Sequence, residues 1–204
     1  MSHMFVPGPV DVAPEVLAAQ TKPMIPHRSK DFEAIFKRTE EKAKQLFFTE
    51  NRVFQGSCSG SGMQEAGIRN LVEESVLSCI NGSFSQRWND VAIANGKQAD
   101  KIEVDYGEAI TPDLLRDALK KKHYEAVTIV HNETSTGVEN PVKELCKVVQ
   151  EVSPDTLILV DAVSSLAGVK IEMDAWGIDF MLTSSQKCLA LPPGLALAAT
   201  SDRA

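Results

Sequence analysis

The sequence predicts an α/β fold, a three-layer sandwich in which helices cover both faces of a mostly parallel central sheet. Short apolar runs of strand length alternate in the second half of the chain with segments of helical period, as in parallel β-α-β units. Several runs are apolar throughout, which is typical of strands buried on both faces. Polar residues follow these runs, at the strand ends where such sheets bind ligands. With 204 residues, 43% of them apolar, the chain is long enough for one core.

The first quarter of the chain divides into an arm and a helical segment. Residues 5–30 contain five prolines and no sustained period, so we expect an irregular arm over residues 1–30 and a folded domain over 31–204. From Ser29 onward, apolar residues recur at helical spacing among charged ones. A short strand is expected over 52–56. After a glycine-rich turn, a second helical period runs from Gly62 to Val76.

The second half alternates regularly between strands and helices. Thr111 followed by Pro112 predicts a helix start, because threonine is a good N-cap and proline fits the first helical position. This helix is expected to continue through Leu119, and another to cover 142–152. The expected strands are 100–104, 126–130, 156–160, 178–182 and 195–199.

Composition and charge exclude several classes of protein. A formal net charge of −7 argues against a nucleic-acid-binding surface, and the lysines at 120–122 are expected to mark a helix C-terminus. The four cysteines lack the pairing typical of disulfide frameworks or zinc sites, so we expect no metal and a reducing compartment such as the cytoplasm. No apolar run reaches membrane-spanning length and no export signal opens the chain.

A lysine follows the expected strand at 178–182. Lys187 stands among small hydroxyl residues and is followed by an apolar run at 189–191. Partial desolvation by that run would lower the pKa of its amine and favour Schiff-base formation with an aldehyde. The alternative is an ordinary solvated loop lysine. Lys187 is therefore a candidate covalent catalyst.

A turn rich in glycine and serine joins the strand at 52–56 to the next helix. Residues 56–62 offer consecutive backbone N–H groups, hydroxyls and a helix N-terminus, which together favour an anion such as phosphate. The turn is not the dinucleotide-binding fingerprint, because Glu65 stands where the third glycine would be, and it lacks the lysine of a P-loop. A plain tight turn is the alternative.

The same turn has the spacing of a cysteine nucleophile elbow, with Cys58 at its apex. That chemistry requires an acid and then a histidine further along the chain. Asp105 with His123 or His131 has the required order. A small α/β hydrolase with Cys58 as nucleophile is thus a second hypothesis.

An aspartate ends the apolar run at 156–160. The carboxylate of Asp161 leaves a buried strand and must find a cationic or N–H partner. It could cap Ser164 or Ser165, or it could pair with a protonated pyridine nitrogen and keep a bound pyridoxal ring an electron sink. A phosphate anchor, an acid for the ring and a lysine for the aldehyde are expected at one sheet edge, and pyridoxal 5'-phosphate requires these three contacts.

The chain resembles class V pyridoxal-phosphate aminotransferases of fold type I, in the branch of serine–glyoxylate and alanine–glyoxylate enzymes. The resemblance covers nearly the whole chain, with many motifs in family order. The motifs are Pro7-Gly-Pro9, His27-Arg-Ser29, Ser59-Gly-Ser-Gly62, Asn81-Gly-Ser-Phe-Ser-Gln-Arg87, His131-Asn-Glu-Thr-Ser-Thr-Gly137, Val160-Asp-Ala-Val-Ser164, Ser184-Ser-Gln-Lys187 and Pro192-Pro-Gly194.

The resemblance implies roles for nine residues. Lys187 would form the Schiff base and carry the proton, and Asp161 would pair with the pyridine nitrogen. Phe84 would stack on one face of the ring and Val163 would pack on the other, while Thr134 would lie near the ring hydroxyl. The phosphate would be held by Ser59, Gly60, Ser61 and Gln186.

The resemblance also implies an activity and a missing part. The family moves an amino group from a small amino acid such as serine or alanine to an oxo acid such as glyoxylate or pyruvate, as homodimers. Its members continue well beyond the position of Ala204 into a small C-terminal domain, which we expect to be absent here or supplied by a complementing chain. A non-catalytic fragment is a third hypothesis. Gln186 disfavours cysteine desulfurases, which usually carry histidine before the lysine.

Overall fold

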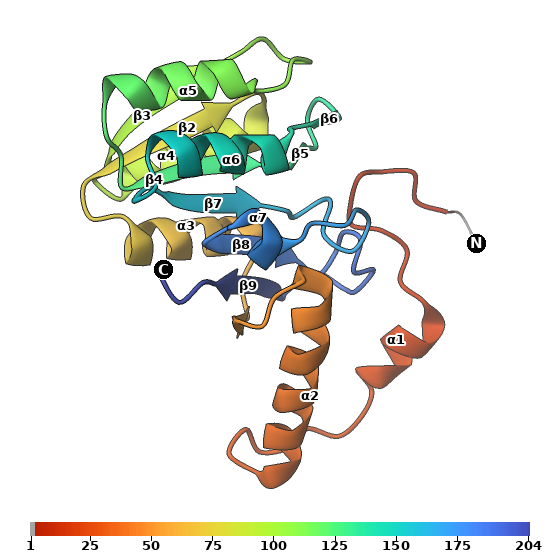
Figure 1. The fold of residues 1–204 in the computed structure, drawn as a ribbon. Helices are drawn as coiled ribbons and strands as arrows, with labels where there is room; N and C mark the ends of the chain where they lie inside the picture. Colours follow the sequence, from red (N-terminus) through yellow and green to blue (C-terminus); the bar gives the residue numbers. More distant parts are fainter. Residues whose placement is uncertain (1–2) are drawn as a thin grey trace.

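A mostly parallel sheet of seven strands forms the centre of the computed structural model, which describes residues 3–204 (Figure 1). The sheet order is β1-β9-β8-β7-β4-β2-β3, and only the pairings of β9 with β8 and with β1 are antiparallel. The expected α/β class is therefore confirmed. The strands are β1 (Arg52–Gly56), β2 (Ser75–Ile80), β3 (Gln98–Glu103), β4 (Ala126–Val130), β7 (Leu157–Asp161), β8 (Phe180–Ser184) and β9 (Ala196–Thr200).

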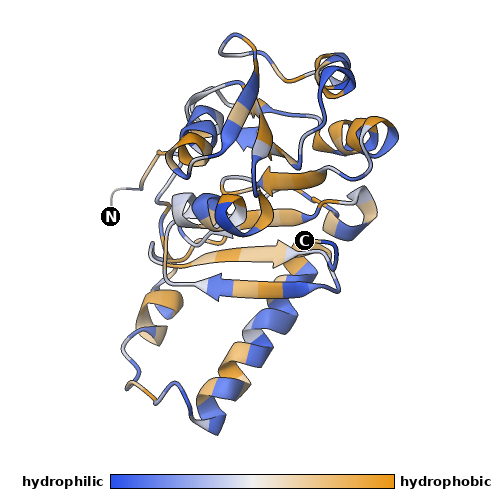
Figure 2. Ribbon diagram, turned by 90° about the vertical axis from the view of Figure 1, so that its left-hand side faces the viewer, coloured by the Kyte–Doolittle hydropathy of each residue, from blue (hydrophilic) through white to orange (hydrophobic). Residues whose placement is uncertain are grey.

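Helices cover both faces of this sheet, which gives the three layers. On one face α5 and α6 pack against each other and against the sheet, in an apolar cluster that includes Leu115, Leu145 and Ile129. On the other face α3 and α4 bury Ile68 and Trp88. Figure 2 shows the apolar central strands between these layers. The helices are α1 (Pro14–Ala19), α2 (Lys30–Phe47), α3 (Gly60–Leu71), α4 (Ser83–Ala94), α5 (Pro112–Lys121), α6 (Val142–Val152) and α7 (Met173–Trp176).

The expected helix from Gly62 to Val76 is too long. Helix α3 ends at Leu71, and Val72 already has an extended backbone with φ −128° and ψ 120°. Val76 belongs to β2, a strand that the sequence analysis did not predict. Burial on both faces of the sheet favours β2, because a run of buried residues centred on Leu77 fits a central strand better than a half-exposed helix. Helix α4 was also not predicted.

The N-terminal arm is less irregular than expected. Residues 14–19 form the short helix α1, which begins with a proline at a position where the missing N–H costs nothing. Beyond it, Ser29 caps α2 by accepting a hydrogen bond from the Phe32 N–H at 3.2 Å. Residues 1 and 2 of the expected arm lie outside the part of the chain that the structure describes. No helix within residues 3–204 has the length and apolar character to cross a membrane.

The carboxyl ends of the parallel strands meet at one edge of the sheet. A small hairpin of β5 (Asn132–Glu133) and β6 (Val138–Glu139) follows β4 there. Asp161 ends β7 at the same edge, and Ser184 ends β8. This is the edge at which open α/β sheets bind ligands.

Candidate active site

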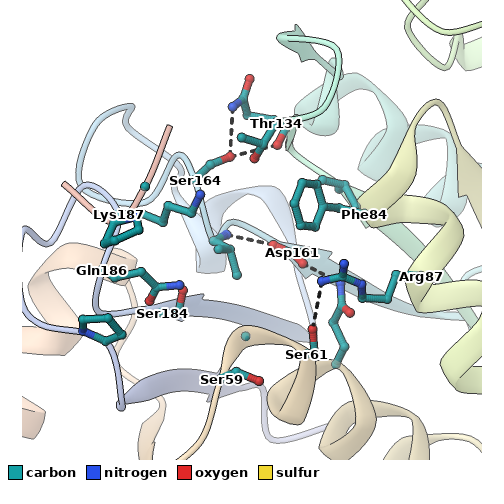
Figure 3. Close-up of a pocket in the computed structure, with 18 residues that line it drawn as sticks. Ser59, Ser61, Phe84, Arg87, Thr134, Asp161, Ser164, Ser184, Gln186 and Lys187 are labelled. Atoms are coloured by element: carbon teal, nitrogen blue, oxygen red, sulfur yellow. Dashed lines mark hydrogen bonds between the residues drawn. The ribbon is translucent and has the colours of Figure 1, made fainter. Parts of the chain in front are cut away.

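A cavity of about 300 Å³ lies at this edge of the sheet, and all nine residues named by the sequence analysis line it (Figure 3). They come from five parts of the chain: the start of α3, the start of α4, the loop after β4, the end of β7 with the loop that follows it, and the loop after β8. The nine are Ser59, Gly60, Ser61, Phe84, Thr134, Asp161, Val163, Gln186 and Lys187.

The N-terminus of α3 forms one wall of the cavity. Ser59 is its N-cap and accepts a hydrogen bond from the Gly62 N–H at 3.2 Å, so the helix starts with its remaining free N–H groups directed outward. Gly60 packs so closely against Val163 that a Cβ atom at position 60 would come within 2.7 Å of Val163 Cγ2. A glycine therefore lets this helix end approach the cavity, where the helix dipole favours an anion.

Asp161 lies at the base of the cavity and is 5% exposed. Its Oδ1 accepts the Val163 N–H at 2.8 Å and its Oδ2 accepts Nε2 of Gln64 at 2.7 Å. It caps neither Ser164 nor Ser165, so that alternative is wrong. Burial raises the pKa of the Asp161 carboxyl from 3.8 to about 6, and the two hydrogen bonds oppose this rise.

Lys187 is half-buried beside the N-terminal arm. Its Nζ donates to the carbonyl of Pro7 at 3.3 Å, and the Val10 N–H donates to the carbonyl of Gln186 at 3.2 Å. Burial lowers the pKa of the Lys187 amine, and the charge of Asp161 acts in the opposite direction. Lys187 is thus partly desolvated beside the arm, whereas the apolar run at 189–191, to which the sequence analysis assigned this effect, does not line the cavity.

Phe84 and Arg87 lie in the first turns of α4 and face the same cavity. The Cζ atom of Arg87 is 5.0 Å from the centroid of the Phe84 ring, a cation–π arrangement. Arg87 also donates from Nη1 to Ser61 Oγ at 3.4 Å. Figure 3 shows Phe84, Arg87 and Asp161 gathered on one side of the cavity and Lys187 and Gln186 on the other.

The loops after β4 and β7 are tied together above the cavity. Asn132 donates from Nδ2 to Ser164 Oγ at 2.9 Å, and that hydroxyl donates to the Asn132 carbonyl at 2.9 Å. Thr134 follows in the hairpin loop, and Val163 projects from the β7 loop; both are half-buried. The rigid pairing of these loops keeps the two side chains at the cavity wall.

Sequence reasoning missed several residues of the site. Arg87 stood in a motif already identified, three positions after Phe84, where a helix places side chains on one face. Ser184 belonged to the hydroxyl run before Lys187, and its buried Oγ has no hydrogen-bond partner within residues 3–204. Gln64 could have been noticed as a polar residue on the buried face of α3, since its neighbours Met63 and Ile68 are core residues.

The elbow hypothesis for Cys58 finds no catalytic partners in the structure. His123 Nδ1 lies 3.3 Å from Ser153 Oγ, and His131 Nε2 lies 3.7 Å from a carboxylate oxygen of Glu139. Within residues 3–204, no hydrogen bond joins Cys58 to either histidine or to Asp105. The required acid–histidine–cysteine arrangement is not assembled.

The residues present fit pyridoxal 5'-phosphate. The α3 N-terminus has free donors suited to a phosphate, and the unpartnered Ser184 Oγ is a further polar group at the cavity. Asp161 is a buried carboxylate held only by neutral donors, which suits a protonated pyridine nitrogen. Lys187 supplies an amine with a lowered pKa.

Comparison with known proteins gives a consistent result. The family profile described as Aminotransferase class-V matches residues 15–204. An uncharacterised aminotransferase of Methanocaldococcus jannaschii is 41% identical over 204 residues, covering 98% of this chain and 52% of that protein. Serine–glyoxylate aminotransferase of Methylorubrum extorquens is 34% identical over 209 residues, covering 100% and 52%. The chain spans about half the length of the curated relatives it matches.

Solved structures agree with the sequence relatives. The crystal structure of alanine–glyoxylate aminotransferase from Nostoc sp. superimposes with a TM-score of 0.94 at 33% identity, covering 100% of this chain and 55% of that one. The fold is therefore that of fold type I aminotransferases, a class whose cofactor is pyridoxal 5'-phosphate. Because the family profile covers almost the whole sequence, the chain belongs to the class V aminotransferases.

Proposed function

We propose that this chain is the cofactor-binding part of a pyridoxal-phosphate-dependent aminotransferase, with residues 1–30 as an arm and 31–204 as the large domain. One observation carries the proposal: the α3 N-terminus, the Asp161 carboxylate and the Lys187 amine line a single cavity. These groups come from distant parts of the sequence. Their chemistry matches the phosphate, the ring nitrogen and the aldehyde of the cofactor, respectively.

Each wall of the cavity has a task in this proposal. Ser59, Gly60 and Ser61 hold the phosphate with the helix N-terminus, and Gln186 closes this wall from the β8 side. When bound, pyridoxal phosphate supplies an aldehyde that reacts with amines and a ring that withdraws electrons. The remaining residues position that ring: Asp161 at its nitrogen, Phe84 and Val163 on its faces and Thr134 near its hydroxyl.

Lys187 is the residue that acts on protons and on the covalent link. An amine with a lowered pKa is unprotonated more of the time and is therefore a better nucleophile at neutral pH. The same amine, once free, can take the proton from the α-carbon of a bound amino acid and return it elsewhere. The carbonyl of Pro7 in the arm accepts a hydrogen bond from this nitrogen and holds it at the cavity.

The substrates are proposed from the relatives. Their names describe transfer from serine, alanine or aspartate to glyoxylate. We propose a small amino acid such as serine or alanine as donor and an oxo acid such as glyoxylate or pyruvate as acceptor. Exposed apolar side chains of the arm, Phe5 and Met24, support association with a second copy or a complementing chain. The unpaired cysteines support a reducing compartment such as the cytoplasm.

Borohydride reduction tests the proposal. The protein is incubated with pyridoxal phosphate, reduced, and weighed intact by mass spectrometry before peptide mapping. We expect one added reduced cofactor, on the peptide that contains Lys187. Lys187→Ala should show none, whereas Lys42→Ala, which changes an exposed lysine of α2, should keep the adduct. An unmodified wild-type mass, or an equal adduct in Lys187→Ala, would contradict the assignment.

A further inference from the structure

A buried glutamine of α3 holds the Asp161 carboxylate. Gln64 is 2% exposed and lines the cavity. It donates from Nε2 to Asp161 Oδ2 at 2.7 Å, while the Val163 N–H donates to Oδ1 at 2.8 Å. These are the two hydrogen bonds to this carboxylate within residues 3–204. Both donors are neutral, so they fix the carboxylate without cancelling its charge.

Gln64 is itself fixed in place. Its backbone carbonyl accepts a hydrogen bond from Nε1 of Trp88 at 3.1 Å, and Trp88 is a fully buried residue of α4. Its side-chain Oε1 is buried and has no partner in the part of the chain that the structure describes. Ser59 caps the same helix, so one rigid element carries both the proposed phosphate wall and the amide that holds Asp161.

We propose that Gln64 is a positioning residue, whose amide holds Asp161 so that a cationic ring nitrogen in the cavity meets an oriented, ionised carboxylate. The inference rests on the proposed function, since only a cationic ligand gives the held carboxylate a charged partner. An apolar side chain of similar size at this position would leave Oδ2 without a donor. The buried acid would then favour its protonated form, which cannot pair with a cation.

Several other groups act on the ionisation of Asp161, and each must stay constant in a test. Burial raises its pKa most strongly, and the charge of Glu133 from β5 adds to the rise. Arg87 from α4 lowers it. Lys187, in the loop after β8, is close enough to feel the charge of Asp161. Glu133, Arg87 and Lys187 all lie outside α3, and a leucine of similar size keeps the carboxyl buried, so Gln64→Leu tests mainly the loss of the amide.

The test compares Gln64→Leu with the unmodified chain. In the cofactor-free protein the Asp161 carboxyl is titrated by ¹³C NMR, and we expect its midpoint to rise by about one pH unit or more. Affinity for pyridoxal phosphate at pH 7 should fall by about tenfold. On acidification, binding should also begin to weaken at a higher pH than in the unmodified protein. Asn70→Leu is the matched control, because within residues 3–204 the Asn70 amide of the same helix bonds only the carbonyl of Ala66.

An unchanged Asp161 midpoint in a folded Gln64→Leu variant overturns the inference. If the variant does not fold, the same question is put to the unmodified protein. The side-chain ¹⁵N signal of Gln64 should then titrate with the same midpoint as the Asp161 carboxyl carbon. A Gln64 signal that does not change at this midpoint overturns the inference. Failure of the proposed function is separate, because it appears as the absence of a borohydride adduct on Lys187.

Discussion

The Glu133 carboxylate accepts hydrogen bonds from both the backbone N–H and the hydroxyl of Ser85, each at 2.9 Å. Glu133 is fully buried in the β5–β6 hairpin, whereas Ser85 lies in the first turn of α4. The Phe84 N–H also donates to it, at 3.2 Å. The N-cap of α4 is Gly82, which has no side chain for this purpose, so a carboxylate from another segment caps the helix.

Glu133→Gln should destabilise the protein. The amide keeps one acceptor oxygen but turns an NH₂ group toward N–H donors, which leaves buried groups unpaired and removes an anion from the helix N-terminus. We expect a loss of about 2–4 kcal/mol in the free energy of unfolding, measured by urea denaturation. Glu139→Gln on the exposed strand of the same hairpin is the control and should change stability by under about 0.5 kcal/mol. Equal losses in the two variants would show that the cap is unimportant.

Asp161→Asn should stabilise the cofactor-free protein above pH 6 while weakening cofactor binding. The folded-state pKa of Asp161 is raised from 3.8 to about 6, so between these values the folded state binds more protons than the unfolded state. The contribution of Asp161 to the free energy of unfolding therefore falls as the pH rises from 3.8 to about 6, by at most roughly 3 kcal/mol. Asparagine avoids the penalty, since Gln64 can turn its amide to pair with it. Thermal unfolding at pH 5 and pH 8 checks the prediction: the two proteins should differ more at pH 8, and a constant difference would contradict it.

Gly60→Ala should weaken pyridoxal phosphate binding by about tenfold or more. The added Cβ would come within 2.7 Å of Val163 Cγ2, so the helix N-terminus must move from its place at the cavity. Binding is measured by equilibrium titration. Val163→Ala removes the clashing methyl group, so Gly60→Ala should cost less affinity in that background than alone. An equal loss of affinity in both backgrounds would show that the contact with Val163 is not the cause.

Arg203→Leu should cost about 2–4 kcal/mol of stability, because it leaves the buried Asp179 carboxylate without its cationic partner. Arg203 donates to Asp179 from Nη2 at 2.6 Å and from Nε at 3.1 Å. The hydrogen bond from the Ile158 N–H to Asp179 Oδ2, which is 2.8 Å long, is retained in the variant. Adding Asp179→Asn should recover part of the loss, since no uncompensated charge remains. Urea denaturation of the three proteins measures this, and a further loss in the double variant would contradict it.

Segments with their own local signals could be predicted from the sequence. The strand at 126–130 and the helix at 142–152 have the expected bounds, and Thr111 caps α5 through the Leu114 N–H as its sequence predicts. Strand β2 could not be found in this way, because Val72 and Val76 continue the helical spacing of Leu71. The choice between helix and strand there depends on burial from both faces, which is a tertiary effect.

The site was predictable where strand ends or family motifs mark it, and all nine named residues line the cavity. Their chemical roles stay predictions. Gln64 and Glu133 could not be predicted from local patterns, because each acts on a residue far away in the sequence. Gln64 is 97 positions from Asp161, and Glu133 is 48 from Ser85. Such pairings depend on the packing of α3 and the β5–β6 hairpin onto the sheet.

The strand order has a consequence for synthesis on the ribosome. Strand β1 is made early, but its sheet partner β9 includes Thr200, which pairs with Arg52. The polypeptide must therefore emerge almost to residue 200 before β1 can join the sheet, while β2, β3 and β4 can already pair with one another. The glycine-rich turn after β1 consequently gains its final shape only after β9 has emerged. A nascent chain arrested before β9 should have the β2–β4 part of the sheet and no competence to bind phosphate.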